Sequence, residues 1–229
     1  MGLVRRRAPV FILVALVIVV AGVGVATRDD SSRGAARPEP PPATVLSGDE
    51  AVTRFLDAWE RSRTGTFVMR SQFRRILTDG QRLERIVVTV QAPPEHLTID
   101  GGSITGVLDG VRVACSVDDE GARECREGAE VENGAYSRSV DTQLETLAGY
   151  VTGPNRLYEV TVDAEDCFVL AQDRHLPAAP FGTQGRFCFD AETGALSFTE
   201  IARPEGTDRL EATEIRAEVT EADLSIPSA

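Results

Sequence analysis

The stretch IVVTVQAPPEHLTIDGGSITGVLDGVRVACSV, residues 86–117, decides the fold class. Apolar residues recur at every second position in it, and Pro93-Pro94, Gly101-Gly102 and Asp109-Gly110 separate the apolar runs. A period of two places alternate side chains on opposite faces of a β-strand, and short turns of this kind join antiparallel neighbours. The stretch therefore predicts an antiparallel meander with one apolar face and one face of arginines and threonines.

Further strands are predicted on both sides of this meander. Before it, Phe67, Met69 and Phe73 share one side of an alternating run that ends near the turn Thr78-Asp79-Gly80. After it, apolar or alternating runs bounded by turn residues predict more strands of the same kind. These later strands are expected at residues 158–162, 167–170, 187–189, 196–201 and 210–219.

A first helix is predicted ahead of the strands. Ser47 is a good N-cap, and Glu50 three residues later would complete a capping box. Gly65 is expected to end the helix. Its apolar stripe, at positions i, i+3, i+4 and i+7, consists of Val52, Phe55, Leu56 and Trp59.

A second helix is predicted in the middle of the chain, ending near Gly153-Pro154. Its stripe consists of Val140, Leu144, Leu147 and Val151. Residues 126–138 before it are polar and are expected to form a loop. The predicted fold is therefore α+β, with an antiparallel sheet covered by two helices.

The N-terminus carries a membrane-targeting segment. Residues 5–7 are arginines, and Ala8–Thr27 holds 20 residues without a charge. A helix of that length spans a hydrocarbon core of about 30 Å. The basic flank predicts a cytoplasmic N-terminus, with the bulk of the chain outside the cell membrane. The segment is either an uncleaved single-pass anchor or a signal peptide that is cleaved after the small-residue site Gly24-Val25-Ala26.

The chain is therefore expected to have three parts. Residues 1–27 form the predicted transmembrane helix, or signal anchor. Residues 28–47 are rich in proline, serine and charge, and are expected to be a disordered linker. Residues 48–229 are expected to form a single extracytoplasmic domain.

All four cysteines fall in this domain, and outside the membrane cysteines form disulfides. Four cysteines allow three connectivities. A hairpin loop at Asp119-Glu120-Gly121 would place Cys115 opposite Cys125 on neighbouring strands. Cys167 and Cys188 flank a loop rich in proline and glycine, which a bridge would pin to the sheet. These two local pairs are the favoured connectivity.

Charge and motifs exclude several functions. The formal net charge is −12, which repels a phosphate backbone and argues against nucleic-acid binding. The only histidines, His96 and His175, lack metal-site spacing, and the acidic residues between 118 and 124 lack that of a calcium loop. No nucleophile elbow or phosphate loop occurs. The sequence predicts no enzyme, no metal and no cofactor.

Several short stretches resemble the LolA-like half-barrel proteins, which include bacterial lipoprotein carriers and lipid-binding lipoproteins of the mycobacterial envelope. Residues 67–73 resemble the first strand of that family, and residues 94–110 its P-x-x-L-x-I and Asp-Gly stretch. FCFDAETGAL at 187–196 and EVTEADLSIP at 218–227 resemble its strand-turn-strand and closing segments. The likeness implies a curved sheet, a half-barrel, folded over helices.

In that family an apolar cavity between sheet and helices holds lipid chains. The resemblance implies that this protein binds a lipid, an acyl chain or another apolar ligand, while fixed to the plasma membrane by its N-terminal helix. The alternative is a ligand-free scaffold or sensor that acts on an envelope protein partner. Candidate residues lining the cavity are Phe67, Met69, Phe73, Val88, Val90, Leu97, Leu144 and Leu147.

Overall fold

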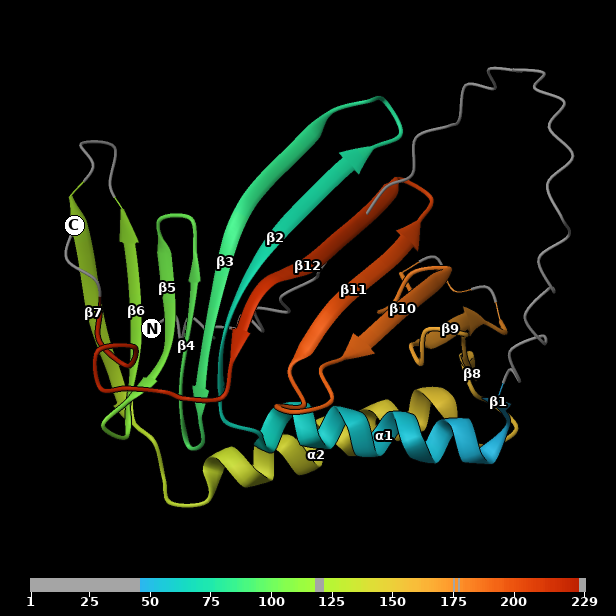
Figure 1. The fold of residues 1–229 in the computed structure, drawn as a ribbon, viewed down its shortest axis with the longest axis horizontal. Coiled ribbons are helices and arrows are strands. Elements are labelled where there is room, and N and C mark those ends of the chain that lie inside the picture. The colour runs from blue at the N-terminus through green and yellow to red at the C-terminus, as the bar shows by residue number, and fades with distance from the viewer. Residues whose placement is uncertain (1–45, 118–121, 175, 177, 227–229) are drawn as a thin grey trace, which may run out of the picture.

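The computed structural model describes residues 46–117, 122–174, 176 and 178–226. Within these residues 12 strands form one open antiparallel sheet, and two helices pack against it (Figure 1). The strands are β1 (Leu46–Ser47), β2 (Phe67–Leu77), β3 (Arg82–Ala92), β4 (Glu95–Asp100), β5 (Ser103–Leu108), β6 (Val111–Val117), β7 (Arg123–Glu130), β8 (Tyr158–Val162), β9 (Phe168–Gln172), β10 (Gln184–Phe189), β11 (Leu196–Arg203) and β12 (Gly206–Arg216). The helices are α1 (Asp49–Thr64) and α2 (Ala135–Val151).

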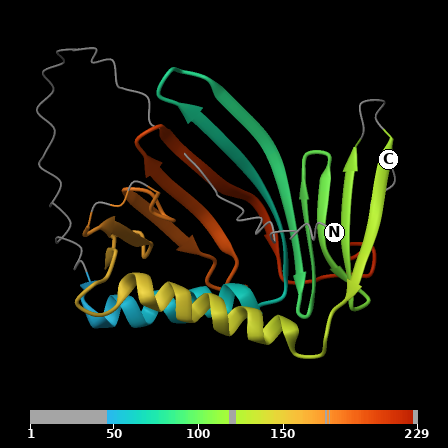
Figure 2. The same cartoon turned by 180° about the vertical axis from the view of Figure 1, so that it is seen from behind.

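The strand order is β1-β8-β9-β10-β11-β12-β2-β3-β4-β5-β6-β7. The meander predicted from residues 86–117 forms one end of this sheet, and β8–β12 form the other. Both helices run side by side along one end of the strands, and Figure 2 shows α2 nearer the viewer from behind. The α+β class and the two helices are confirmed, and the open sheet is consistent with a half-barrel.

Of the stripe that the sequence predicts on helix α1, only Phe55 is fully buried. Val52, Leu56 and Trp59 are half-buried and pack against the same core. The ring centroid of Phe55 lies 5.4 Å from that of Phe168 and 5.9 Å from that of Phe187. The capping prediction is wrong. Gly48, with φ at 76°, is the N-cap, and no side chain caps the helix. Ser47 cannot serve because it belongs to β1 and pairs with Thr161 of β8.

The loop predicted at residues 126–138 is also wrong. Strand β7 continues to Glu130, and α2 begins at Ala135. Strand β7 is the last strand of the sheet, so both of its faces are largely exposed and it lacks an apolar alternation. Helix α2 has Gly134 as its N-cap, without a side-chain hydrogen bond, so no capping motif marks its start.

The register divides the sheet into two faces, which we name the inner and the outer face. The inner face is the one on which α1 and α2 pack, and the outer face is its reverse. On β8–β11 the inner face is apolar and, together with the two helices, forms the larger core. Its buried sheet residues are Tyr158, Val160, Val162, Phe168, Leu170, Phe187 and Ile201.

The apolar side changes face between β2 and β3. One inner row runs through paired residues Met69, Thr89, Thr98, Thr105 and Ala114, and is mostly polar beyond Met69. The adjacent outer row runs through Val68, Val90, Leu97, Gly106 and Val113. The meander therefore has its apolar side on the outer face, turned away from the helices.

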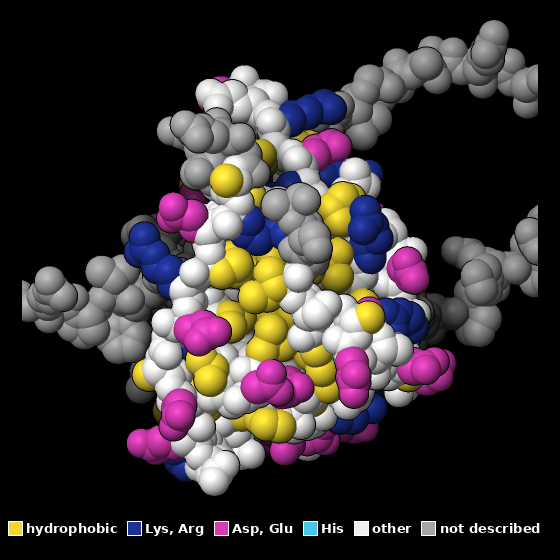
Figure 3. All heavy atoms as spheres, turned by 90° about the vertical axis from the view of Figure 1, so that its left-hand side faces the viewer, with side chains coloured by type: hydrophobic (Ala, Val, Ile, Leu, Met, Phe, Trp, Pro, Cys, Tyr) yellow, Lys and Arg dark blue, Asp and Glu magenta, His cyan; other side chains and the backbone are white. Residues whose placement is uncertain are grey.

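The C-terminal segment, residues 217–226, covers part of this outer apolar side. Val219, Leu224 and Ile226 pack against the cluster formed by Val90, Leu97, Ile104 and Cys115. An ion pair between Arg216 and Asp223 holds the segment, and Thr220 donates to the same carboxylate. These hydrogen bonds, that from Arg216 first, lower the pKa of Asp223 to about 2. Figure 3 shows hydrophobic side chains gathered on this side of the molecule.

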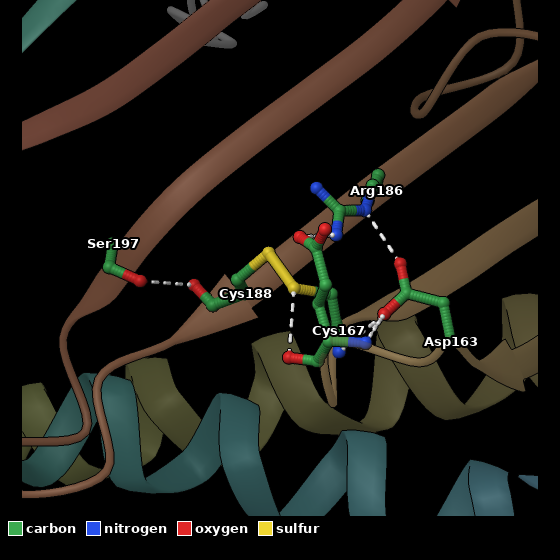
Figure 4. Close-up of a disulfide and its surroundings, with 6 residues drawn as sticks. Asp163, Cys167, Arg186, Cys188 and Ser197 are labelled. Atoms are coloured by element: carbon green, nitrogen blue, oxygen red, sulfur yellow. Dashed lines mark hydrogen bonds and ion pairs between the residues drawn. A yellow bond between two sulfur atoms is a disulfide. The ribbon is translucent and has the colours of Figure 1, made fainter. Parts of the chain in front are cut away.

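Both predicted disulfides are present. Cys115 pairs with Cys125 across β6 and β7, in the predicted register. Cys167 bridges to Cys188, and the surrounding hydrogen bonds fix both ends (Figure 4). Asp163 accepts from the backbone N–H of Cys167 and from Arg186, and Ser197 donates to the carbonyl of Cys188. The bridge closes the end of the β9–β10 hairpin that lies away from the loop, so it does not pin the loop as predicted. The loop is held instead by hydrogen bonds from Arg203 to the carbonyls of Ala179 and Pro180.

Several predicted features lie outside the described residues. These are the predicted membrane span Ala8–Thr27, most of the linker, the hairpin tip at 119–121 and His175. Among the residues that the structure describes, no helix is long and apolar enough to span a bilayer.

We expect Gly106 to be indispensable for packing β5 on β4. A Cβ built there would clash with the backbone carbonyl of His96, which the sheet pairing holds in place. Gly106→Ala should lower the free energy of unfolding by roughly 1–3 kcal/mol. As a matched control, Gly149→Ala in α2 meets no atom within 4 Å and should raise it by about 0.5–1 kcal/mol. Chemical denaturation measures both, and equal effects would contradict the assignment.

Candidate functional site

The structure does not bring the eight predicted cavity residues together. Phe67, Met69 and Phe73 are buried on the inner face of β2. Leu147 is buried between α2 and the sheet, and Leu144 is half-buried on the same helix. The other three, Val88, Val90 and Leu97, belong to the outer cluster. Their contact with a ligand stays a prediction.

The physical reason is the register of β2 and β3. Val88 pairs with Arg70, and Val90 with Val68, so the apolar positions of β3 match the outer positions of β2. The sequence shows that each strand has one apolar side, but not that the two sides face opposite ways. The eight residues therefore lie on opposite faces of the sheet and do not share one core.

A large hollow lies elsewhere on the inner face. It has a volume of about 650 Å³ and opens between the first turns of α2 and strands β4–β7. None of the eight predicted residues lines it. Its lining residues are Arg63, Pro94, His96, Thr98, Thr105, Gly106, Val107, Arg112, Val113, Ala114, Arg126, Glu127, Gly128, Val131, Ala135, Tyr136 and Ser139.

The alternation of the strands supplies most of this lining. His96 pairs with Val107, which pairs with Arg112, so these three side chains form one row on the inner face. Thr105 pairs with Ala114, which pairs with Arg126, in the next row. Arginines, threonines and small apolar residues thus share one wall, because the apolar side of the meander faces the other way.

Three arginines line this hollow. Arg112 comes from β6, Arg126 from β7 and Arg63 from the last turn of α1. Within the described part of the chain, none of the three has a carboxylate within 4.0 Å, and the Nε of Arg63 is buried without a hydrogen-bond partner. Glu127 is the one acidic residue of the lining. The hollow is therefore cationic in a chain of net charge −12.

Tyr136 joins α1, α2 and the sheet at the edge of the hollow. Its hydroxyl donates a hydrogen bond to the carbonyl of Arg63, whose guanidinium lies 6.0 Å from the ring centroid. The ring centroid of His96 lies 5.6 Å from that of Tyr136. Burial raises the pKa of Tyr136, so the hydroxyl stays protonated and keeps donating.

The N-terminus of α2 adds partial positive charge to the same region. Its first turn contains no acidic residue and no side-chain cap, so nothing in the helix neutralises its dipole there. Ala135 and Tyr136, its first two residues, line the hollow. An anion in the hollow would lie near this helix end as well as near the arginines.

Sequence reasoning identified none of these arginines as a site. The sequence predicts that one face of the meander carries arginines and threonines, but not that this face borders a hollow. Arg63 and Tyr136 come from helix ends whose packing depends on tertiary structure. Among the described residues, no group of three or more histidine, cysteine or acidic side chains could hold a metal ion.

Comparison with known proteins gives a faint structural likeness. No protein-family model matches the sequence, and no curated protein is significantly similar to it. The fold is similar to the crystal structure of a LolA superfamily protein from Nitrosomonas europaea, with 8% identity over 79% of this chain and 98% of the other, at a TM-score of 0.26. It is also similar to a domain assigned as an outer membrane lipoprotein-sorting protein from Vibrio parahaemolyticus, with 9% identity over 76% and 97%, at 0.24. The first of these is a LolA superfamily protein, the family that the sequence motifs resemble. Because the TM-scores are low, the likeness contributes nothing to the functional proposal.

We expect His96 to make stability depend on pH. Burial lowers the pKa of His96 most strongly, the hydrogen bond with the Pro94 carbonyl partly offsets this, and Arg63 lowers it further. A lowered folded pKa means that the unfolded chain binds more protons below about pH 6.5. Stability should therefore fall as the pH drops from about 7 through this range, and level off below the folded pKa.

Denaturation curves at a series of pH values, with His96→Gln as the comparison, measure this effect. The variant should lose the part of the pH dependence that lies below about pH 6.5. An NMR titration of the two histidines should show His96 titrating at a lower pH than an exposed histidine. A normal pKa for His96, or the same pH dependence in the variant, would contradict the prediction.

Proposed function

We propose that this protein is a membrane-anchored extracytoplasmic binding protein that takes the anionic group of an amphiphilic ligand in the inner-face hollow. The observation that carries the proposal is that Arg63, Arg112 and Arg126 line one hollow. Because none of the three has a carboxylate within 4.0 Å among the described residues, their charges are available to an anion in the same concavity.

The chemistry of the lining favours a phosphate or carboxylate head group. Guanidinium groups bind such anions through charge-assisted hydrogen bonds, often in a bidentate way. Threonine and serine hydroxyls beside them, from Thr98, Thr105 and Ser139, can donate further hydrogen bonds. A hollow of about 650 Å³ lies within the range of small-molecule sites.

The remaining lining can accept the beginning of an apolar chain. Pro94, Val107, Ala114 and Val131 lie in the same hollow as the arginines. Apolar contact contributes about 0.8 kcal/mol for each buried methylene group. A ligand with an anionic head and an aliphatic part would thus use both kinds of surface, whereas an uncharged hydrocarbon would leave the arginines unpaired.

The N-terminal segment supports a place at the membrane. Ala8–Thr27 is long enough to be a single-pass anchor, with residues 5–7 on the cytoplasmic side. A linker of about 18 residues then precedes Leu46. Such an anchor would hold the domain near a source of anionic lipids, which suits a stationary receptor or acceptor better than a diffusing carrier.

Titration of the full chain with short-chain lipids tests the proposal. The chain would be placed in nanodiscs of neutral lipid and titrated by calorimetry with dihexanoyl phosphatidylglycerol and, separately, with dihexanoyl phosphatidylcholine. Arg112→Gln and Arg126→Gln should each weaken binding of the anionic lipid by about 10-fold or more, since a hydrogen bond to a charged group contributes about 1.5–3 kcal/mol. Added salt should weaken it as well.

Arg82→Gln is the matched control, because Arg82 is exposed on β3 and does not line the hollow. It should bind as the wild type does. Equal affinity for both lipids, or an unchanged affinity in Arg112→Gln, would refute the anion site.

A second candidate function is a protein-interaction module, and the outer face favours it. Ile86 and Val117 are each 39% exposed on the apolar side of the meander, where the C-terminal segment leaves them uncovered. Exposed apolar surface of this kind marks contact sites for other proteins. A chain that binds neither lipid in the titration would be assigned to this function instead.

A further inference from the structure

Strand β7 ends the sheet with a long free edge. It has eight residues, Arg123–Glu130, and its only strand partner in the described structure is β6. At the opposite end of the sheet, β1 has only two residues. An unpaired strand of this length offers a row of backbone donors and acceptors to another chain. Figure 1 shows β7 at the outer limit of the sheet.

The pairing with β6 determines which backbone groups point outward. Cys115 and Cys125 lie opposite each other with a Cα–Cα distance of 4.0 Å. That close approach is typical of the non-hydrogen-bonded pairs of an antiparallel ladder. The N–H and C=O of Cys125 therefore point toward the free edge, and those of Arg123 and Glu127 do the same.

We infer that this edge pairs with β7 of a second copy of the chain, in an antiparallel register centred on Cys125. A two-fold axis through that position sets Glu124 of each copy directly opposite Arg126 of the other. The same register sets Arg123 opposite Glu127. Directly opposite residues of an antiparallel pair point to the same face, so each set brings unlike charges into contact.

The sequence of β7 disfavours the neighbouring symmetric registers. A two-fold axis at Arg123, Glu124, Arg126 or Glu127 places that charged residue against its own copy. Like charges directly opposite each other destabilise a sheet. Among these five central positions only Cys125 is uncharged, and only there do the flanking charges also match. Among the registers centred on residues 123–127, the charge pattern of RECRE thus favours the one centred on Cys125.

The two charged residues on the inner side of this seam are available for the contact. Glu124 and Arg126 are exposed, and neither has an ion pair within the described residues. Arg126 also lines the hollow, whereas Arg63 and Arg112 come from α1 and β6, away from the edge. The pairing is inferred from the edge alone and does not depend on any ligand.

Cross-linking of a freed cysteine tests the register. Cys115→Ser releases the thiol of Cys125, which lies on the inferred axis about 5.5 Å in Cα–Cα distance from its copy. A short bismaleimide should then link the full chain, in neutral detergent, into a covalent dimer. Cys125→Ser removes the same disulfide but frees Cys115, one strand further in, and should give no dimer.

Charge exchange at the seam separates specific pairing from chance collision. In the Cys115→Ser background, Glu124→Arg places arginines opposite arginines and should reduce the cross-linked dimer at least 10-fold. Adding Arg126→Glu restores unlike pairs with the signs exchanged, and should restore the dimer. A dimer that persists in Glu124→Arg, or that the double substitution does not restore, would overturn the inference.

Sedimentation of the chain with both disulfides intact gives an independent measurement. With increasing concentration, the mean mass of the wild type should rise toward the mass of a dimer. The mean mass of the Glu124→Arg variant should stay at that of a monomer. The mean mass of the variant with both Glu124→Arg and Arg126→Glu should rise as in the wild type. A wild type that stays monomeric over the whole concentration range would also overturn the inference. Lipid titration is not a readout here, so failure of the anion site leaves this test unaffected.

Discussion

The pairing of β2 with β3 is the constraint on which the rest of the structure depends. Its register sets Met69 beside Thr89 and Val68 beside Val90, so the apolar side changes face at this point of the sheet. One half of the sheet must then be covered from the inside and the other from the outside. Helices α1 and α2 cover the first, and the C-terminal segment covers part of the second. The polar inner wall of the meander, and with it the cationic hollow, is a direct consequence.

Most of the fold could be predicted from local patterns. Local patterns arise from interactions between residues that are close in the chain, and they include the alternation in residues 86–117, the turns that interrupt it and the stripe around Phe55. The pairing of Cys115 with Cys125 follows in the same way from the register of one hairpin. Strand β7 and the start of α2 could not be found in this way. An edge strand has no buried side to give it a period, and a helix that begins at Gly134 carries no capping motif.

The candidate site was beyond local patterns for a different reason. A strand sequence shows which side is apolar, but the direction in which that side faces is set by its neighbours, and Val88 and Phe67 therefore entered one predicted cavity although they lie on opposite faces. Arg63, Arg112 and Arg126 are 49 and 14 residues apart along the chain. Their meeting depends on the placement of α1 against the meander, and no spacing rule could have revealed it.

The distribution of charge links the hollow and the free edge. An acidic chain gains solubility from its net charge, and within it the few concentrations of positive charge mark places where an anion could bind. The lining of the hollow contains three arginines and one acidic residue, Glu127. Along residues 123–127 of β7 two arginines and two glutamates alternate instead, so this segment has no net charge but a fixed pattern of charges. The arginines of the hollow suit an external anion. The alternating charges of β7 are instead matched by β7 of a second copy. Strand β7 can therefore contribute to both kinds of recognition, because it supplies Arg126 to the hollow and a pattern of unlike charges to the edge.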